Sequence, residues 1–256
     1  MRYPIPTLKK ASSKIISSLK LLAPVFLASC LATPVYAGMF SVTPVRIYMT
    51  PKDKAMAVTI TNESDEDLVM QADVYAWKQK PNGEDDLSLT EDLLVSPPII
   101  KAQAKSHQVV RLARLIPSPQ GQQMTYRLIV REIPEANPAK NKMQLQVALA
   151  FSMPIFITPP GAKNKLDCIV ERAASNAVNV VCENTGSAYA QPLEFVLANP
   201  AGDKLASLEK AGYILPASKR GFEIKSGNKR IPGGKAKLTL RMDDESRQIF
   251  DVVLAE

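Results

Sequence analysis

The chain has 256 residues, of which 46% are hydrophobic and 22% charged, and 32 Lys and Arg against 25 Asp and Glu give a formal net charge of +7. This composition is typical of a soluble globular protein with enough apolar residues for one large or two smaller domains, and it argues against disordered, collagen-like and multi-span membrane proteins. The positive charge would suit a polyanion binder only if it lay in the folded part of the chain.

Much of the positive charge lies at the N-terminus. Residues 1–37 contain five basic residues and no acid, with an apolar run at 21–28 that leads to the small-residue sequence Val35-Tyr36-Ala37. This order predicts a secretory signal peptide that is cleaved after Ala37. A membrane anchor is disfavoured because the apolar run is well short of the ~20 residues that a spanning helix needs. Lipoprotein processing at Cys30, which ends a Leu-Ala-Ser-Cys sequence, stays open as the alternative.

Removal of the signal peptide changes the meaning of the charge. The mature chain, residues 38–256, has 219 residues and a net charge of only +2. Residues 38–158 are neutral overall and residues 159–256 carry the +2. Neither half is a basic domain, so we expect no nucleic-acid partner and no membrane insertion after signal removal.

Two cysteines, Cys168 and Cys182, remain in the mature chain. An even pair in an exported protein predicts a disulfide. Both cysteines are equally distant from Ser175, which lies in a plausible turn over 173–176, so an antiparallel hairpin would place them face to face. Metal binding is disfavoured, because His107 is the only histidine of the chain and neither cysteine has a CxxC partner.

The mature sequence consists of short β-branched and aliphatic runs separated by Pro, Gly, Asn and Asp, without long stretches of helical period. The first part predicts seven strands, at 40–49, 55–61, 68–77, 95–101, 107–115, 124–133 and 143–157. Seven short strands in this length predict an immunoglobulin-like β-sandwich.

Pro159-Pro160-Gly161 then interrupts the chain, and a second series of strands is expected at 165–171, 177–183, 192–198, 220–225, 235–241 and 248–254. We therefore predict an all-β protein with two immunoglobulin-like sandwiches, over residues 38–158 and 159–256.

Motifs of catalysis are missing from the sequence. It contains no G-x-S-x-G, no P-loop, no dinucleotide-binding glycine pattern and no H-E-x-x-H. His107 stands at the polar start of a predicted strand, where an exposed histidine is expected. The acidic runs at 63–67 and 84–86 lie in turn regions and lack the spacing of a calcium loop, so we interpret them as solvated loops. We expect no enzyme, no cofactor and no metal.

The last predicted strand of the first domain is unusually regular. Large apolar residues occupy every second position, namely Met143, Leu145, Val147, Leu149, Phe151 and Met153, and Gln144, Gln146, Ala148, Ala150 and Ser152 lie between them. The eleven residues would span roughly 36 Å at ~3.3 Å per residue, about twice a usual strand. The apolar row is either covered by the sandwich or available to a partner by strand addition, and the periodicity alone does not decide.

Several segments, in their order and spacing, resemble the periplasmic chaperones that assemble pili or fimbriae through the chaperone–usher pathway. They are Lys54–Asn62 (KAMAVTITN), Ala76-Trp77, Val95–Ile99 (VSPPI), Gln108–Leu112 (QVVRL), Tyr126–Pro134 (YRLIVREIP) and the alternating strand. The Arg-Glu-Ile-Pro ending, followed by a short loop, is the most specific of these. The resemblance covers essentially the whole mature chain.

The resemblance implies two immunoglobulin-like domains in a boomerang arrangement, a periplasmic location and the binding of pilin subunits by donor-strand complementation, followed by delivery to an outer-membrane usher. The donor side chains carried over are Met143, Leu145, Val147 and Leu149, with Phe151 next in register. An exposed donor edge would also let two copies cover each other as a self-capping homodimer.

The resemblance also implies basic residues that anchor the C-terminal carboxylate of the subunit. Arg46 matches one of them, but Pro154 stands where better-known members have a lysine. Arg127, at the start of the neighbouring strand, is the candidate replacement, and a solvent-facing arginine is the alternative interpretation. This departure, together with the cysteine placement, points to the archaic or alternative branch of the family.

One function of another class stays open, a secreted β-sandwich adhesin or carbohydrate-binding module in which the alternating strand is only core. Surface aromatic residues would favour it, whereas Trp77, the single tryptophan, lies in a strand position typical of a core. The sequence does not identify the subunits, the usher or the organelle.

Overall fold

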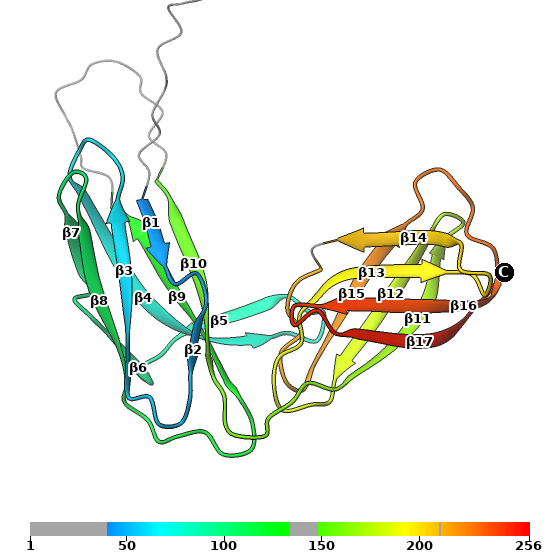
Figure 1. The fold of residues 1–256 in the computed structure, drawn as a ribbon, viewed down its shortest axis with the longest axis horizontal. Coiled ribbons are helices and arrows are strands. Elements are labelled where there is room, and N and C mark those ends of the chain that lie inside the picture. Colours follow the sequence, from blue (N-terminus) through cyan, green and yellow to red (C-terminus); the bar gives the residue numbers. More distant parts are fainter. Residues whose placement is uncertain (1–39, 134–147, 210) are drawn as a thin grey trace, which may run out of the picture. The chain divides into compact units, whose positions relative to one another are not determined.

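The computed structural model describes residues 40–133, 148–209 and 211–256, within one compact unit that runs from Phe40 to Glu256. All regular elements of this part of the chain are β-strands (Figure 1). They form two β-sandwiches with separate cores, one from residues 40–157 and one from residues 166–254. The predicted all-β class with two sandwiches is therefore confirmed. The predicted signal cleavage site lies outside the described residues, and the boundary at 158/159 stays a prediction.

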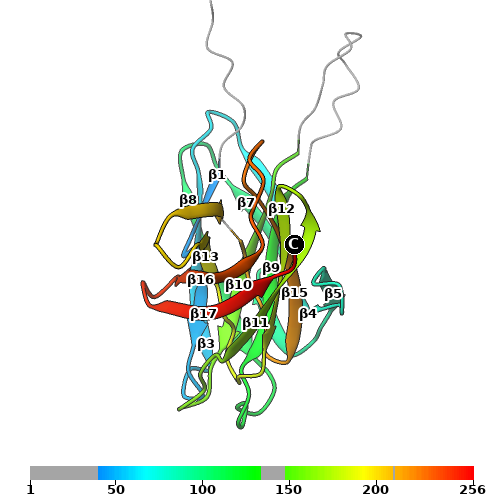
Figure 2. The ribbon, with the colours of Figure 1, turned by 90° about the vertical axis from the view of Figure 1, so that its right-hand side faces the viewer.

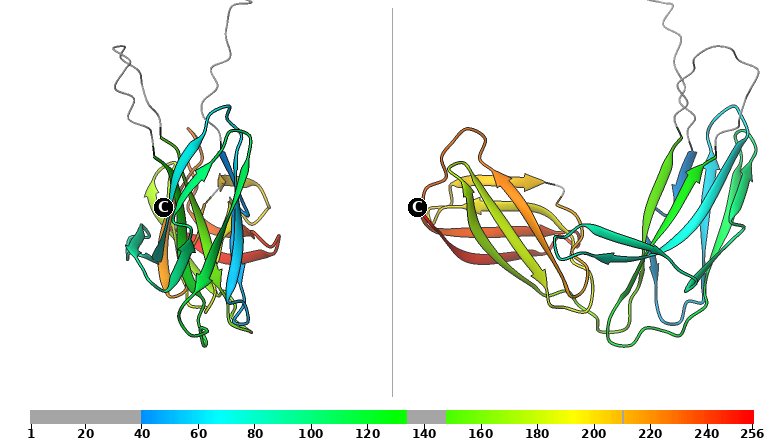
Figure 3. Two further views of the ribbon diagram at one scale, coloured as in Figure 1. Left: turned by 90° about the vertical axis from the view of Figure 1, so that its left-hand side faces the viewer. Right: turned by 180° about the vertical axis from the view of Figure 1, so that it is seen from behind.

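The N-terminal sandwich has two sheets (Figure 3). The four-stranded sheet has the order β1 (Phe40–Thr43), β3 (Ala55–Asn62), β8 (His107–Arg114) and β6 (Leu93–Ser96). The six-stranded sheet has the order β2 (Ile47–Met49), β10 (Ala150–Ile157), β9 (Met124–Glu132), β4 (Leu68–Gln79) and β5 (Asp85–Leu89), with β7 (Ile99–Ala102) also paired to β4. Alternate residues of these strands fill the core between the sheets, as the period of two requires.

Two predicted strands are each divided between the sheets. The segment predicted as one strand at 40–49 breaks at Pro44 into β1 and β2, which pair in different sheets. The segment predicted at 95–101 breaks at Pro97-Pro98 into β6 and β7, again in different sheets. Proline has no N–H to donate to a ladder, so in both segments the pairing stops and the chain crosses from one sheet to the other.

Strand β5 corrects the interpretation of the acidic run at 84–86 as a loop. Asp85 and Asp86 are the first residues of β5, an exposed strand that pairs with the end of β4. The turn before it closes with a hydrogen bond from the Gly83 N–H to the Lys80 carbonyl, 2.8 Å, and Gly83 has a φ of 83°, which favours glycine. The prediction failed because aspartate disfavours strands and no buried face imposed a period of two.

The C-terminal sandwich has a three-stranded and a four-stranded sheet (Figure 2). The first has the order β11 (Leu166–Ala174), β12 (Ala177–Asn184) and β15 (Ser218–Lys225). The second has the order β14 (Lys204–Glu209), β13 (Pro192–Ala198), β16 (Gly234–Met242) and β17 (Arg247–Leu254). The sequence did not indicate β14, but it predicted the other six strands near their observed bounds.

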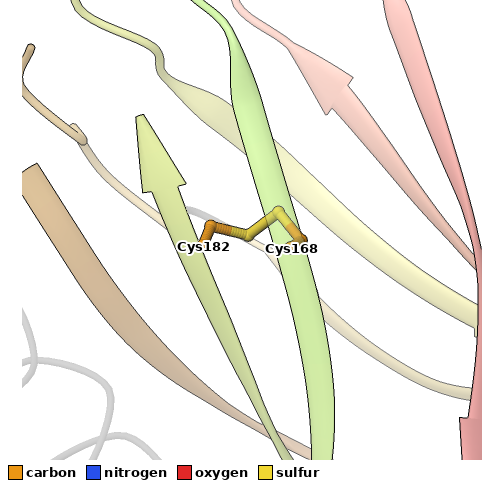
Figure 4. Close-up of a disulfide and its surroundings, with 2 residues drawn as sticks. All are labelled: Cys168 and Cys182. Carbon is orange, nitrogen blue, oxygen red and sulfur yellow. A yellow bond between two sulfur atoms is a disulfide. The ribbon is translucent and has the colours of Figure 1, made fainter. Parts of the chain in front are cut away.

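The predicted disulfide is present. Cys168 of β11 and Cys182 of β12 are direct cross-strand neighbours and their sulfurs are bonded (Figure 4). The hairpin turn is tighter than expected, because β11 continues to Ala174 and only Ser175 and Asn176 connect the strands. Cys182 is fully buried in the core of the C-terminal sandwich. The bond therefore fixes the register of this hairpin.

Replacement of both cysteines by alanine should lower the free energy of unfolding of the C-terminal sandwich by ~3 kcal/mol, because the bond closes a loop of about 15 residues in the unfolded chain. Urea unfolding of the purified mature protein measures the change. Reduction of the unmodified protein is the matched control and should give the same loss. A loss of less than ~1 kcal/mol in both would show that the disulfide is not a structural staple.

Candidate functional site

Arg46, which matches an anchor residue of the family, and Arg127, the candidate replacement for the second, both lie close to Tyr213. Arg46 immediately precedes β2, and Arg127 lies on β9. The guanidinium carbon of each is 5.7 Å from the centroid of the Tyr213 ring. Both guanidinium groups therefore lie around the Tyr213 ring, although the three residues are far apart in the sequence.

Arg127 takes the place beside Pro154. The two residues are direct partners in the antiparallel pairing of β9 with β10, so their side chains project from the same face of the sheet. The Arg127 guanidinium carbon is 3.8 Å from the Trp77 ring centroid, and its Nη2 is 3.5 Å from an Asp85 carboxylate oxygen. Only 14% of the Arg127 side chain is exposed. A solvent-facing arginine is therefore not what the structure shows.

The electrostatics of Arg127 reflect this burial. Burial lowers the pKa of its guanidinium, and the charges of Asp85 and Tyr213 act against that shift. An arginine stays protonated even so, because its usual pKa lies far above neutral pH. The result is a cation that is held against the face of an indole ring, where the attraction of the ring quadrupole replaces part of the lost hydration.

Arg46 belongs to a chain of polar contacts. Its Nη1 lies 3.5 Å from a carboxylate oxygen of Asp243, in the turn between β16 and β17. The same oxygen accepts a hydrogen bond from the Tyr189 hydroxyl at 3.0 Å, and the Tyr48 and Tyr189 hydroxyls are 3.0 Å apart. Partial burial disfavours the charge of Arg46, but a hydrogen bond with Tyr48 and the nearby phenols outweigh it, so the Arg46 pKa is raised.

An aromatic cluster supports both arginines. Its buried members are Trp77, Phe156 and Leu215, with Tyr189 and Tyr213 packed against them. Phe156 stacks on Tyr189 with ring centroids 4.1 Å apart. Trp77 is only 1% exposed, as expected of a core residue, but it packs in this cluster and not in either sandwich core.

Gln79, at the end of β4, holds the segment that carries Tyr213. Its amide donates a hydrogen bond to the Tyr213 carbonyl at 3.0 Å and accepts one from the Leu215 N–H at 2.9 Å. The side-chain amide thus pairs with the backbone as a neighbouring strand would. This pair of bonds fixes where the Tyr213 ring stands relative to Arg127.

Part of the predicted donor row can be located. Met143, Leu145 and Val147 lie outside the described residues. Leu149 packs partly buried against the N-terminal core, and Phe151 is the second residue of β10. Phe151 is 37% exposed and meets Phe40 of β1 edge-to-face, with ring centroids 4.8 Å apart.

The free edge of β10 lies beside this pair of rings. β10 pairs with β9 over residues 150–157, but with β2 only over residues 155–157. In the part of the chain that the structure describes, residues 150–154 therefore have a strand on one side only. β1 is likewise the outermost strand of its sheet. Phe151, which is partly exposed, thus lies at the edge of β10 and contacts β1, another edge strand. Edge strands beside an exposed apolar side chain are typical sites for the addition of another strand.

Several residues of the site had no signal in the sequence. Asp85, Asp243, Tyr189 and Tyr213 carry no motif, and only the fold brings them to the arginines. His107 begins β8 with an exposed side chain, as predicted. Among the described residues there is no cluster of three or more His, Cys, Asp or Glu side chains that could hold a metal, and no helix of the length and apolarity that crossing a membrane demands.

A family model described as the N-terminal domain of the pili and flagellar-assembly chaperone PapD matches residues 39–163. This match contains β1 to β10, both arginines and the free edge. Residues 39–163 therefore belong to this chaperone family. No curated protein sequence matches it.

Solved structures of other pilus-assembly chaperones share the fold. The chaperone–tip subunit complex CsuC–CsuE from archaic Csu pili of Acinetobacter baumannii is 22% identical, with a TM-score of 0.62 over 85% of this chain and 100% of that one. The E. coli chaperone DraB is 20% identical, with a TM-score of 0.54 over 85% and 97%. The complex of the Salmonella enterica SafA pilin with the SafB chaperone gives 14% identity and a TM-score of 0.58 over 86% and 99%.

The fold of a pilus-assembly chaperone thus extends over both sandwiches. The archaic or alternative branch stays a prediction. The matched family is one of assembly chaperones and not of enzymes, which is in line with the expectation from the sequence.

The buried phenols predict a pH dependence. Burial raises the pKa of Tyr189 and Tyr213 above the usual value of about 10. At high pH the folded protein keeps the protons of these phenols, whereas the unfolded chain loses them. The stabilisation that the neutral phenols provide is therefore complete below pH ~10, and it is lost as the pH rises towards the pKa that they have in the folded protein. Absorbance titration of phenolate, with unfolding followed in parallel, should show tyrosines that ionise late. Tyr189→Phe should remove one late step, and unchanged late ionisation in this variant would contradict the assignment.

Proposed function

We propose that the mature chain is a periplasmic chaperone that binds pilin subunits by donor-strand complementation and delivers them to an outer-membrane usher. The family assignment supports a role in pilus assembly. Two similar structures are complexes of a chaperone with a tip subunit and with a pilin. The predicted signal peptide supports export.

The observation that carries the proposal is the edge of β10 at residues 150–154, which no strand of the described part of the chain covers. Unpaired N–H and C=O groups on a strand are hydrogen-bonding sites for an added strand. A subunit strand that lies along this edge would obtain a ladder of backbone bonds from β10. The same edge supports the self-capping homodimer proposed for the free protein.

The apolar row supplies the second part of the binding. Leu149 and Phe151 project to the core side of the sheet, and Met143, Leu145 and Val147 have the same parity in the sequence. In a strand that continues through residue 143, all five would therefore project to one side. Burial of several such side chains at ~25 cal/mol per Å² would contribute several kcal/mol, enough to keep an incomplete subunit soluble.

Arg46 and Arg127 would hold the C-terminal carboxylate of the subunit and so set the register of the added strand. Charge-assisted bonds from guanidinium groups to a carboxylate are short and directional. Arg127 faces the position of Pro154, where better-known members have a lysine, and it is held in place by Trp77. The missing cation is thereby supplied from the neighbouring strand.

A carbohydrate-binding module has less support than this proposal, because Tyr48 is the one tyrosine of the described residues that is half exposed. Such modules present aromatic faces to the ligand, but Trp77 and Phe156 are both buried.

Substitution of Leu145 and Leu149 by glutamate should abolish recovery of a pilin-like subunit that is co-expressed in the periplasm. Two carboxylates in the row would have to be buried without partners, which costs far more than strand addition returns. Gln144→Glu with Gln146→Glu, at positions that alternate with the apolar row in the sequence, is the matched control and should retain recovery. Undiminished recovery with the leucine variant would refute donor-strand binding.

Arg46→Ala and Arg127→Ala should each weaken subunit binding by about tenfold to a hundredfold, because a hydrogen bond to a charged group contributes ~1.5–3 kcal/mol. Affinity of the purified chaperone for a subunit-derived peptide with a free C-terminal carboxylate is the measurement. Arg131→Ala is the matched control, since Arg131 lies on the same face of β9 and pairs with Asp73. Equal affinities for all three variants and the unmodified protein would remove the anchor from the site.

A further inference from the structure

Arg46, one of the two cations proposed to receive the subunit, already faces a carboxylate of its own chain. This carboxylate belongs to Asp243, and the inference drawn from it rests on the proposed anchor function. Asp243 and Arg46 are 197 residues apart in sequence. An aspartate side chain and a C-terminal carboxylate present the same group, two oxygens that share one negative charge. Both would therefore use the same donors of Arg46.

Asp243 is held firmly, but not mainly by Arg46. Its side chain is 19% exposed and accepts the Tyr189 hydroxyl hydrogen bond at 3.0 Å, and its backbone N–H donates to the Gln191 carbonyl at 3.0 Å. If Arg46 moved away, the carboxylate would keep the Tyr189 bond and remain partly hydrated. The Asp243 carboxylate would thus keep a hydrogen-bond donor and contact with water when the ion pair is broken.

The contact of Asp243 with Arg46 is loose. At 3.5 Å it is well beyond the 2.7–2.9 Å typical of charge-assisted hydrogen bonds, and 35% of the Arg46 side chain is exposed to water. Exposed ion pairs of this kind contribute little to stability. A carboxylate that approached Arg46 with better geometry would therefore displace Asp243 at small cost.

We propose that Asp243 is an internal competitor for the C-terminal carboxylate of the subunit at Arg46. In the free chaperone it faces the arginine, and the carboxylate of a subunit contacts Arg46 only if it replaces Asp243 there. Asp243 lowers the affinity of the chaperone for every ligand with a C-terminal carboxylate. The contacts made by strand addition then have to supply most of the binding free energy. Binding of a bare C-terminus without a complementary groove is thereby weakened.

The opposite role for Asp243 would be to position Arg46 for the ligand. The two roles differ in the sign of one effect. Removal of a competitor strengthens binding of the carboxylate, whereas removal of a positioning group weakens it. Asp243→Asn is the appropriate change, because asparagine has nearly the same shape and its amide oxygen still accepts the Tyr189 bond while the charge is lost.

The experiment measures affinities of the full mature chaperone for a short labelled peptide from the C-terminus of a pilin-like subunit, made with a free carboxylate or with a carboxamide. Asp243→Asn should bind the carboxylate peptide about three- to fivefold more tightly than the unmodified protein, the effect expected from loss of a weak ion pair. Its affinity for the carboxamide peptide should be unchanged. Asp244→Asn is the matched control, since Asp244 bonds to Ser246 in the same turn, and it should leave both affinities unchanged.

Equal or weaker binding of the carboxylate peptide by Asp243→Asn would overturn the proposal, provided that Arg46→Ala weakens the same binding. If Arg46→Ala has no effect, the anchor itself fails and the competitor fails with it. Thermal unfolding shows whether the asparagine variant is folded. Asp243→Ser, which also lacks the charge but retains a hydroxyl acceptor for Tyr189, takes its place if it is not, with the same expected gain.

Discussion

The edge of β10 is the constraint on which the rest of the site depends. A strand in the six-stranded sheet would normally satisfy its backbone on both sides, but β2 covers only the last three residues of β10. The break at Pro44 places the preceding residues in the other sheet as β1, so no strand of the described part of the chain takes the missing place. Within that part, backbone next to Phe151 has no partner strand, a combination that is an aggregation hazard unless another strand uses it.

The basic site is arranged relative to this edge. Arg127 projects beside Pro154 because the two residues are paired across β9 and β10, and the Trp77 ring keeps its guanidinium from turning to solvent. The aromatic cluster around Phe156 holds the tyrosines that surround Arg46. A ligand strand along β10 would thus run towards two fixed positive charges, so apolar contacts would provide most of the affinity and the charges would define where the strand ends.

The free protein keeps these charges neutralised internally. Arg127 faces Asp85 on β5, and Arg46 faces Asp243. Unpaired buried cations would be costly, so the proposed anchor would require internal partners until its ligand arrives. Such partners would have to be weak enough to be replaced, and both contacts are long, at 3.5 Å. If the two arginines bind a subunit as proposed, the same pairs would set both the stability of the free protein and its capacity to bind.

Much of this fold follows from the sequence by itself. Alternation of apolar residues predicted most strands, Pro, Gly, Asn and Asp predicted many of the turns between them, and the symmetric cysteines around Ser175 predicted a cross-strand disulfide, because each of these signals acts over a few residues. The sequence failed at β5, whose exposed residues carry no period, and at the division of 40–49 and 95–101 between two sheets. The partners of the arginines were decided only by the tertiary structure. Asp85, Tyr189, Tyr213 and Asp243 come from distant strands and turns, and no local pattern encodes contacts that exist only once the sheets have packed.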